Sequence, residues 1–223
     1  MNNYSSNLPT SAIRVFYYEF KRMIKIYFRN KSHILNSFIF FLLSISVIHI
    51  GIGPGDIPES STAGIIISYL IFTIILTSEL MLEEDYRNGT LEEFQILGVA
   101  FEFILAAKYF AFALILILVS LFAIPIASLF FEISLSSLPI FFLISFLVTI
   151  NISLLALLCS AFTLGLNSSP LLPLLILPLS FPVLIISNLA VNNPSLLLIP
   201  FGSFLILFPI TMVSTRLAIQ SSL

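Results

Sequence analysis

The sequence predicts an all-α polytopic membrane protein that crosses the bilayer six times and forms a single transmembrane domain over residues 1–223. Of the 223 residues, 59% are hydrophobic and 9% are charged, which is too apolar for a chain that closes around one water-soluble core. Six apolar runs are long enough to cross about 30 Å of hydrocarbon as helices that rise 1.5 Å per residue. They are apolar on every side, unlike the alternating strands of a barrel. The predicted spans are residues 34–50, 63–82, 109–131, 138–162, 171–191 and 196–213.

The segment before the first span, residues 11–33, has the pattern of an amphipathic helix. Its apolar residues recur every three or four positions, and cations lie on the remaining surface. We expect a helix that lies in the membrane interface, with its rings at headgroup depth and its cations toward anionic lipid. It serves either as an anchor and topology signal or as a connecting helix that also contacts a cytoplasmic partner. The apolar residues are Ile13, Phe16, Tyr17, Phe20, Ile24, Tyr27 and Phe28, and the cations are Arg14, Lys21, Lys25 and Arg29.

The basic residues indicate how the spans are oriented. All nine Lys and Arg lie before the first span, around the connection between the second and third, or after the sixth. The connections on the other side hold Asp56, Glu59 and Glu132 but no Lys or Arg. Because basic residues favour the cytoplasmic side, both termini are predicted to be cytoplasmic. The first segment lacks the features of a cleaved signal peptide or an organellar leader, which favours a bacterial inner membrane over a mitochondrial one.

The connection between the second and third spans is the longest polar stretch of the chain. Asn88-Gly89 predicts a turn, and Thr90 with Glu93 matches a capping box, so a short cytoplasmic helix is expected over about 90–97. One interpretation is an ordinary solvated surface. The other is a coupling helix that docks by an apolar side and is pushed by a partner. The residues assigned to this predicted coupling surface are Glu79, Glu84, Asp85, Gly89, Thr90, Leu91, Glu92 and Phe94.

Charge is nearly absent from the membrane interior. The third to sixth predicted spans contain no Asp, Glu, Lys, Arg or His, which disfavours a proton- or sodium-coupled transporter. No GxxxxGK[ST] stretch is present to hold ATP, so energy for transport must come from another subunit. We therefore expect no enzymatic activity and no catalytic residue. A net charge of −2 excludes nucleic-acid binding.

The cysteine and histidine residues do not predict a metal or redox site. Cys159 is the one cysteine, so the chain has no internal disulfide and no CxxC or CxxCH motif. His33 and His49 occupy opposite ends of the first span, so one chain cannot bring both to one iron. We expect two interfacial histidines and no metal.

Two spans carry features that suggest a role in helix packing or helix movement more than a role in catalysis or ligand binding. Small residues in the fourth span follow a four-three spacing that places them in one helix-packing seam, which serves packing within the subunit, a homodimer contact or a substrate-lining face. In the fifth span, Pro178 and Pro182 each remove a backbone hydrogen bond on the same face, so a kink or local unwinding is expected and a hinge is the hypothesis. The seam residues are Thr149, Ser153, Ala156, Ser160 and Thr163.

Several of these segments, in matching order, resemble the CcmB or haem exporter protein B family over nearly the whole chain. The acidic stretch that ends in Gly-Thr-Leu-Glu looks like that family's acidic, Gly-[Ser/Thr]-Leu-Glu motif. Departures are Leu80 in place of a frequent basic residue, Asn88 in place of Asp, and missing prolines near 98–102. These departures bear on the charge balance of the ATPase contact. The matching segments are Glu79 through Glu92, Ala107-Lys108, residues 177–185, Pro209 through Arg216 with Ile219 and Gln220, Ile52-Gly53-Pro54, and Gly64.

The resemblance implies a permease of the ABC-2 export type that works with a cytoplasmic ABC ATPase. It also implies further membrane subunits of cytochrome c maturation and a haem chaperone on the outer side, with haem as the transported or handled ligand. We expect the chain to form a homodimer. The alternatives are an ABC-2 permease for a lipid, polysaccharide or drug, and a non-transporting scaffold that assembles its neighbours.

Overall fold

The computed structural model describes residues 12–29, 31–53, 58–78, 81–96, 101–165 and 171–222, and these ranges are almost entirely helical. Six of the helices are long and apolar enough to cross a membrane, namely α2, α3, α6, α7, α8 and α9. The all-α prediction with six spans is therefore confirmed. The elements are α1 (Ala12–Arg29), α2 (Lys31–Ile52), α3 (Glu59–Ser78), α4 (Glu83–Arg87), α5 (Thr90–Ile96), α6 (Phe101–Phe130), α7 (Leu138–Thr163), α8 (Leu171–Ala190), the 3-10 turn η1 (Pro194–Leu197) and α9 (Leu198–Ser222).

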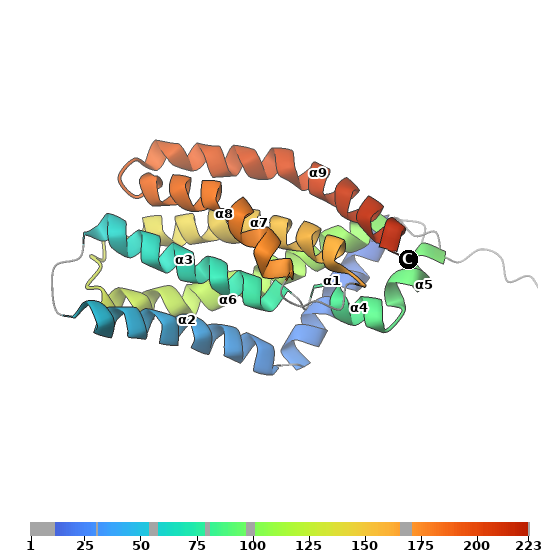
Figure 1. Ribbon diagram of the computed structural model, residues 1–223, viewed down its shortest axis with the longest axis horizontal. Coiled ribbons are helices and arrows are strands. Elements are labelled where there is room, and N and C mark those ends of the chain that lie inside the picture. Colours follow the sequence, from blue (N-terminus) through green and yellow to red (C-terminus); the bar gives the residue numbers. More distant parts are fainter. Residues whose placement is uncertain are drawn as a thin grey trace, which may run out of the picture.

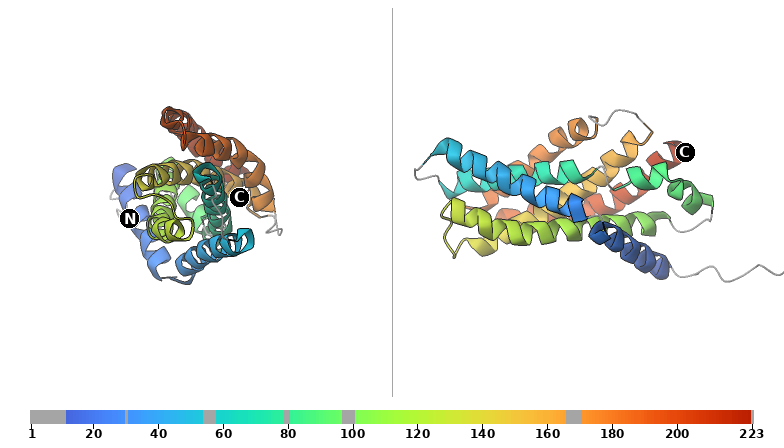
Figure 2. Two further views of the ribbon diagram at one scale, coloured as in Figure 1. Left: turned by 90° about the vertical axis from the view of Figure 1, so that its left-hand side faces the viewer. Right: turned by 90° about the horizontal axis from the view of Figure 1, so that it is seen from below.

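The long helices lie side by side in one bundle, with α2 and α9 on opposite sides (Figures 1 and 2). The helix α7 is central, because it packs against α3, α6, α8 and α9. The oblique helix α1, the short helices α4 and α5, and the last turns of α9 gather at the same end of the bundle (Figure 1). We call this the charged end.

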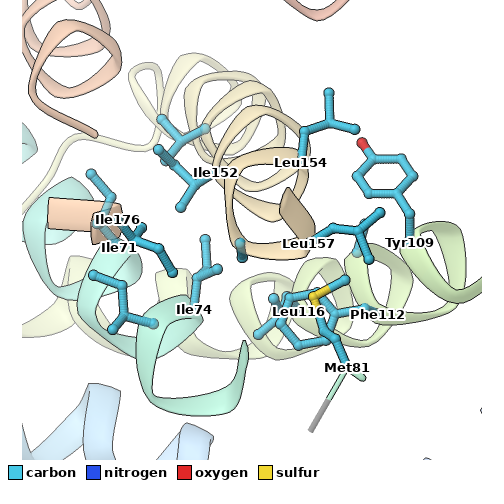
Figure 3. Packing of buried hydrophobic residues seen from close by; sticks show 14 of the residues in the cluster. Ile71, Ile74, Met81, Tyr109, Phe112, Leu116, Ile152, Leu154, Leu157 and Ile176 are labelled. Atoms are coloured by element: carbon cyan, nitrogen blue, oxygen red, sulfur yellow. The ribbon is translucent and has the colours of Figure 1, made fainter. Parts of the chain in front are cut away.

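The core of the bundle is apolar and lies between α3, α6, α7 and α8 (Figure 3). Ile74 of α3, Leu116 of α6, Leu157 of α7 and Ile176 of α8 are buried and belong to this cluster. Large apolar side chains also cover the outer surface, as shown by Phe122, which is 65% exposed. An apolar core inside an apolar exterior is the arrangement expected of a protein whose solvent is lipid.

Polar contacts join the central helix to its neighbours. The Tyr109 hydroxyl of α6 donates to the carbonyl of Ile150 in α7, at 3.0 Å. The buried Asn151 amide donates to the Pro200 carbonyl of α9 at 2.9 Å and accepts from Ser203 Oγ at 2.9 Å. Because unpaired polar groups are costly in hydrocarbon, these bonds fix how α6, α7 and α9 pack.

Two helices extend well beyond the predicted spans. The described part of α6 begins at Phe101, about two turns before the predicted start of the third span, and α9 continues to Ser222 instead of ending near 213. The described part of α3 reaches Ser78. Hydropathy measures the length inside hydrocarbon, whereas the 30 residues of α6 span about 45 Å and so extend well past it.

The proline-rich helix α8 is helical from Leu171 to Ala190, through both Pro178 and Pro182. Local unwinding is therefore not present, although Figure 1 shows that α8 bends part-way along its course. The Ser180 hydroxyl, between the two prolines, donates to the Leu177 carbonyl at 2.7 Å. A hinge at Pro178 and Pro182 stays a prediction.

Candidate functional site

The helix α1 packs mainly against α6, and Tyr27 of the predicted ring-lined face lies in this contact. Its fully buried residues are Glu19, Met23 and Tyr27, which follow one another every four positions. Two of the predicted membrane-facing residues point outward, since Ile13 is 76% and Tyr17 58% exposed. A carboxylate on a buried face requires a cationic partner, and α6 supplies one.

Four charged side chains from three segments meet at the charged end. The ammonium of Lys108 in α6 is completely buried, contacts the Asp85 carboxylate of α4 directly and lies 3.7 Å from Glu19 Oε1. The guanidinium of Arg22 bonds Glu19 at 2.7 Å and Asp85 at 2.9 Å. We call Glu19, Arg22, Asp85 and Lys108 the charge cluster, in which two cations balance two anions.

The surroundings of the charge cluster are largely apolar, so its charged groups are stabilised mainly by one another. The hydrogen bond that Glu19 accepts raises the pKa of Arg22 above its ordinary value, so Arg22 stays cationic. Met23 Sδ lies 3.9 Å from Lys108 Nζ. Burial also raises the pKa of the Tyr27 hydroxyl, which therefore stays protonated.

The cluster also reaches α5, because the Arg22 guanidinium stands 5.9 Å from the centre of the Phe94 ring. This distance is in the range of cation–π attraction. Leu91, one turn before Phe94, is fully buried. Three side chains thus attach α4 and α5 to the rest of the bundle: the ion-paired Asp85, the ring of Phe94 and the buried Leu91.

The turn between α4 and α5 has the geometry that Asn88-Gly89 predicts. Gly89 has φ +71°, a left-handed conformation that glycine adopts without strain. Its carbonyl accepts from the Glu93 amide at 3.1 Å, which makes Gly89 the N-cap. The predicted capping box with Thr90 as N-cap is therefore wrong by one residue, although α5 occupies Thr90–Ile96 as expected.

A second contact joins α4 to the far end of α7. Gly165 has φ +74°, and a Cβ at this position would meet the Tyr86 hydroxyl oxygen at 2.8 Å. The Tyr86 side chain therefore lies directly against the turn that follows α7. This packing needs a residue without a side chain at position 165.

The structure divides the predicted coupling surface into two parts. Glu84 and Glu92 are exposed and available to a partner, and Thr90 and Phe94 are partly buried. Asp85 and Leu91 are turned inward, so they cannot form a docking surface in this conformation. Glu79 lies outside the described residues.

Sequence reasoning missed Glu19, Arg22 and Lys108 as members of a site. Arg22 counted as a marker of topology, and Lys108 as a marker of topology and part of the Ala107-Lys108 resemblance, because Lys108 lies just outside the apolar run that defines the third span. A signal was nonetheless present, since Glu19 is the one acidic residue of the basic segment 11–33. It lies in register with Met23 and Tyr27, which form the buried face.

Four of the five small residues of the predicted seam lie inside the chain, and the fifth, Thr163, is partly buried. Thr149, Ser153, Ala156 and Ser160 of α7 are all buried within this single subunit. The Ser160 hydroxyl donates to the Ser78 carbonyl at the end of α3, at 3.2 Å. Of the three interpretations of the seam, this burial favours packing within the subunit.

Comparison with known proteins places the chain in a family. The sequence profile described as CcmB protein matches residues 14–221, nearly the whole chain. The chain belongs to the CcmB family. A CcmB relative from Haemophilus influenzae, named "Heme exporter protein B", is 30% identical over 195 residues, which cover 86% of this chain and 88% of the relative. Another of that name, from Pseudomonas aeruginosa, is 27% identical over 169 residues, 75% of this chain and 76% of the relative.

The CcmB match includes every segment that contributes to the charge cluster. Residues 14–221 contain α4, α5 and α6 completely and all of the buried face of α1. The site at the charged end therefore lies inside the part of the chain that the family shares.

Proposed function

We propose that this chain is the permease subunit of an ABC transporter complex that handles haem for the biogenesis of c-type cytochromes. The observation that carries the proposal is the CcmB match over residues 14–221, together with two relatives named for haem export. The bundle of six apolar helices is suited to a membrane permease. Haem is the substrate of the complex. The partner proteins take part in handling haem as much as this chain does.

The energy comes from a separate ATPase subunit, because the sequence has no phosphate-binding loop of its own. In the proposed complex this subunit docks on the exposed side of α4 and α5. Glu84, Glu92 and Glu93 give that side its negative charge, and Ile96, which is 84% exposed, gives it an apolar contact. Asp85 is not part of the docking surface.

The distribution of basic residues supports a cytoplasmic charged end, with both termini in the cytoplasm of a bacterium and the spans in its inner membrane. The ATPase and its ATP are then on the same side as α4 and α5. The complex further contains a second copy of this chain, other membrane subunits of cytochrome c maturation, and a haem chaperone on the outer side.

Cells that lack the gene provide the test of the proposed function. They should lose covalently bound haem on c-type cytochromes, detected by haem staining of separated membrane proteins, and keep their other exports. Normal cytochromes with a defect in lipid, polysaccharide or drug export would instead identify another substrate. Normal cytochromes in cells whose partner ATPase cannot hydrolyse ATP would indicate a scaffold.

The docking surface is tested by changing Glu84 and Glu92 to lysine and measuring how much ATPase co-purifies with the chain in detergent. Co-purification should fall, because two repulsive charges replace two attractive ones. The matched control is Glu132→Lys, an exposed acidic residue at the other end of the bundle. Equal recovery of the ATPase with all three forms would place the docking surface elsewhere.

A further inference from the structure

The charge cluster lies behind the proposed docking surface and connects it to the membrane helices. Its members come from three elements: Glu19 and Arg22 from α1, Asp85 from α4, and Lys108 from α6. Asp85 joins all three elements because it contacts both cations, and Lys108 does so because it contacts Asp85 and lies close to Glu19. Asp85 also sits beside Glu84, whose side chain is exposed on the same short helix.

Burial restrains Glu19, Asp85 and Lys108, whereas Arg22, whose side chain is 35% exposed, is held by its two ion pairs. Lys108 is fully buried and Glu19 is 5% exposed, so neither can exchange its partner for water without leaving its site. Separating buried opposite charges costs far more than separating exposed ones. A displacement of α4 therefore carries Arg22 and Lys108 with it, or it breaks the cluster as a whole.

Contacts continue from the cluster into the centre of the bundle. Lys108 is followed in α6 by Tyr109, whose hydroxyl bonds the Ile150 carbonyl of α7. The next residue, Asn151, bonds the Pro200 carbonyl of α9. A displacement of α6 at Lys108 is therefore passed through these buried hydrogen bonds to α7, and from α7 to α9.

Resting on the proposed function, we infer that the charge cluster is the connection that transmits movement of the ATPase-bound helices α4 and α5 into α1 and α6. Arg22 strengthens the connection because it contacts α4 through Asp85 and α5 through Phe94. Glu19, Arg22, Asp85 and Lys108 are positioning residues in this role. They hold α1, α4 and α6 together, and in this way they determine how the subunit responds to the ATPase.

A neutral pair of substitutions separates transmission from folding. In Asp85→Asn with Lys108→Met, one anion and one cation are removed together, so Arg22 and Glu19 remain balanced and the exposed docking surface is untouched. The double variant should bind as much ATPase as the wild type. Covalent haem on c-type cytochromes should fall by at least about fivefold, the lower end of usual coupling factors.

The matched control removes the ion pair between Glu102 and Arg216, which also lies at the charged end but joins α6 to α9. Glu102→Gln with Arg216→Met should leave cytochrome haem at the wild-type level. The conservative variant Asp85→Glu keeps the carboxylate, so cells that carry it should retain most of the cytochrome haem that is lost with the neutral pair.

A second readout is independent of haem. In the purified complex, the wild-type chain should change the rate at which the ATPase hydrolyses ATP, and the neutral pair should abolish that change while the ATPase stays bound. The inference is overturned if the neutral pair and its control behave alike in this assay, or if bound ATPase falls in parallel with activity. Should the deletion strain keep its cytochrome haem, the proposed function fails, and the hydrolysis assay alone still decides the inference.

Discussion

The replacement of Lys108 by methionine tests whether the charge cluster contributes to stability as the geometry requires. Methionine has a similar length and no charge, so the packing against α1 is largely kept. The change leaves the Glu19 and Asp85 carboxylates buried with Arg22 as their remaining partner. Two buried anions then share one cation, and each is 8% exposed or less.

The expected loss follows from that burial. Removing one partner of a buried ion pair costs about 3–5 kcal/mol, mostly because the other charge is left uncompensated. For a chain of this length, 1 kcal/mol corresponds to roughly 2–4 °C in unfolding temperature. The variant Lys108→Met should therefore unfold about 6–20 °C below the wild type.

The chain itself provides the assay. It has no tryptophan, but its one cysteine, Cys159, is 3% exposed in α7. A dye that becomes fluorescent on reacting with a thiol reports the temperature at which Cys159 is uncovered in detergent. The control is Arg87→Met, because Arg87 is also a cation paired with a carboxylate of α4, but its side chain is 75% exposed. Exposed pairs contribute about 0–1 kcal/mol, so the control should shift by roughly 4 °C at most.

Two results would refute this reasoning. If Lys108→Met and Arg87→Met unfold at the same temperature, the four charges are not held in the buried arrangement described here. If the addition of Asp85→Asn to Lys108→Met lowers the unfolding temperature further, the cost does not come from an unbalanced charge. The account expects the second substitution to recover part of the loss, since it removes the excess anion.

Substitutions at three further sites test the packing of the bundle with the same thiol assay. Asn151→Ala should lower the unfolding temperature by roughly 2–12 °C, because it removes the bonds between α7 and α9 at a cost of about 1–3 kcal/mol; no shift would contradict the shared hydrogen bonds. Gly165→Ala should lower the unfolding temperature for two reasons, the backbone φ of +74° and the clash of the new Cβ with the Tyr86 hydroxyl. Adding Tyr86→Phe should relieve only the clash, so full recovery of the unfolding temperature would contradict the backbone strain. Gly64→Ala should leave the unfolding temperature nearly unchanged, because a Cβ there meets the Asn188 side chain at an ordinary 3.5 Å. Gly64→Leu should lower it, because the larger side chain overpacks the same site. Equal effects of the two substitutions would contradict the contact with Asn188.

Hydropathy was sufficient to predict the number and type of the membrane helices. A run such as 138–162 is apolar on all sides, and only a helix satisfies its backbone in hydrocarbon. The ends of the helices were less predictable, since α6 and α9 extend into a polar environment where the apolar signal stops. Phe101, the first residue of α6, follows no capping pattern that marks a start.

The charge cluster could not be predicted from composition, because the pairs that join its three helices are distant in the sequence. Asp85 and Arg22 are 63 residues apart, and nothing local to either indicates the other. The sequence did predict the turn at Asn88-Gly89 and the short helix after it, since these depend on neighbouring residues. It treated Asp85 and Glu84 alike, whereas the fold buries the first and exposes the second.

We propose that this chain converts the motion of a separate ATPase into work at the membrane and hydrolyses no ATP itself. The most direct measurement is the release of phosphate from ATP by the purified chain in detergent, alone and together with its ATPase subunit. The account predicts no release by the chain alone, and release by the pair that stops when the phosphate-binding lysine of the ATPase is replaced. Sustained hydrolysis by the chain alone would contradict it.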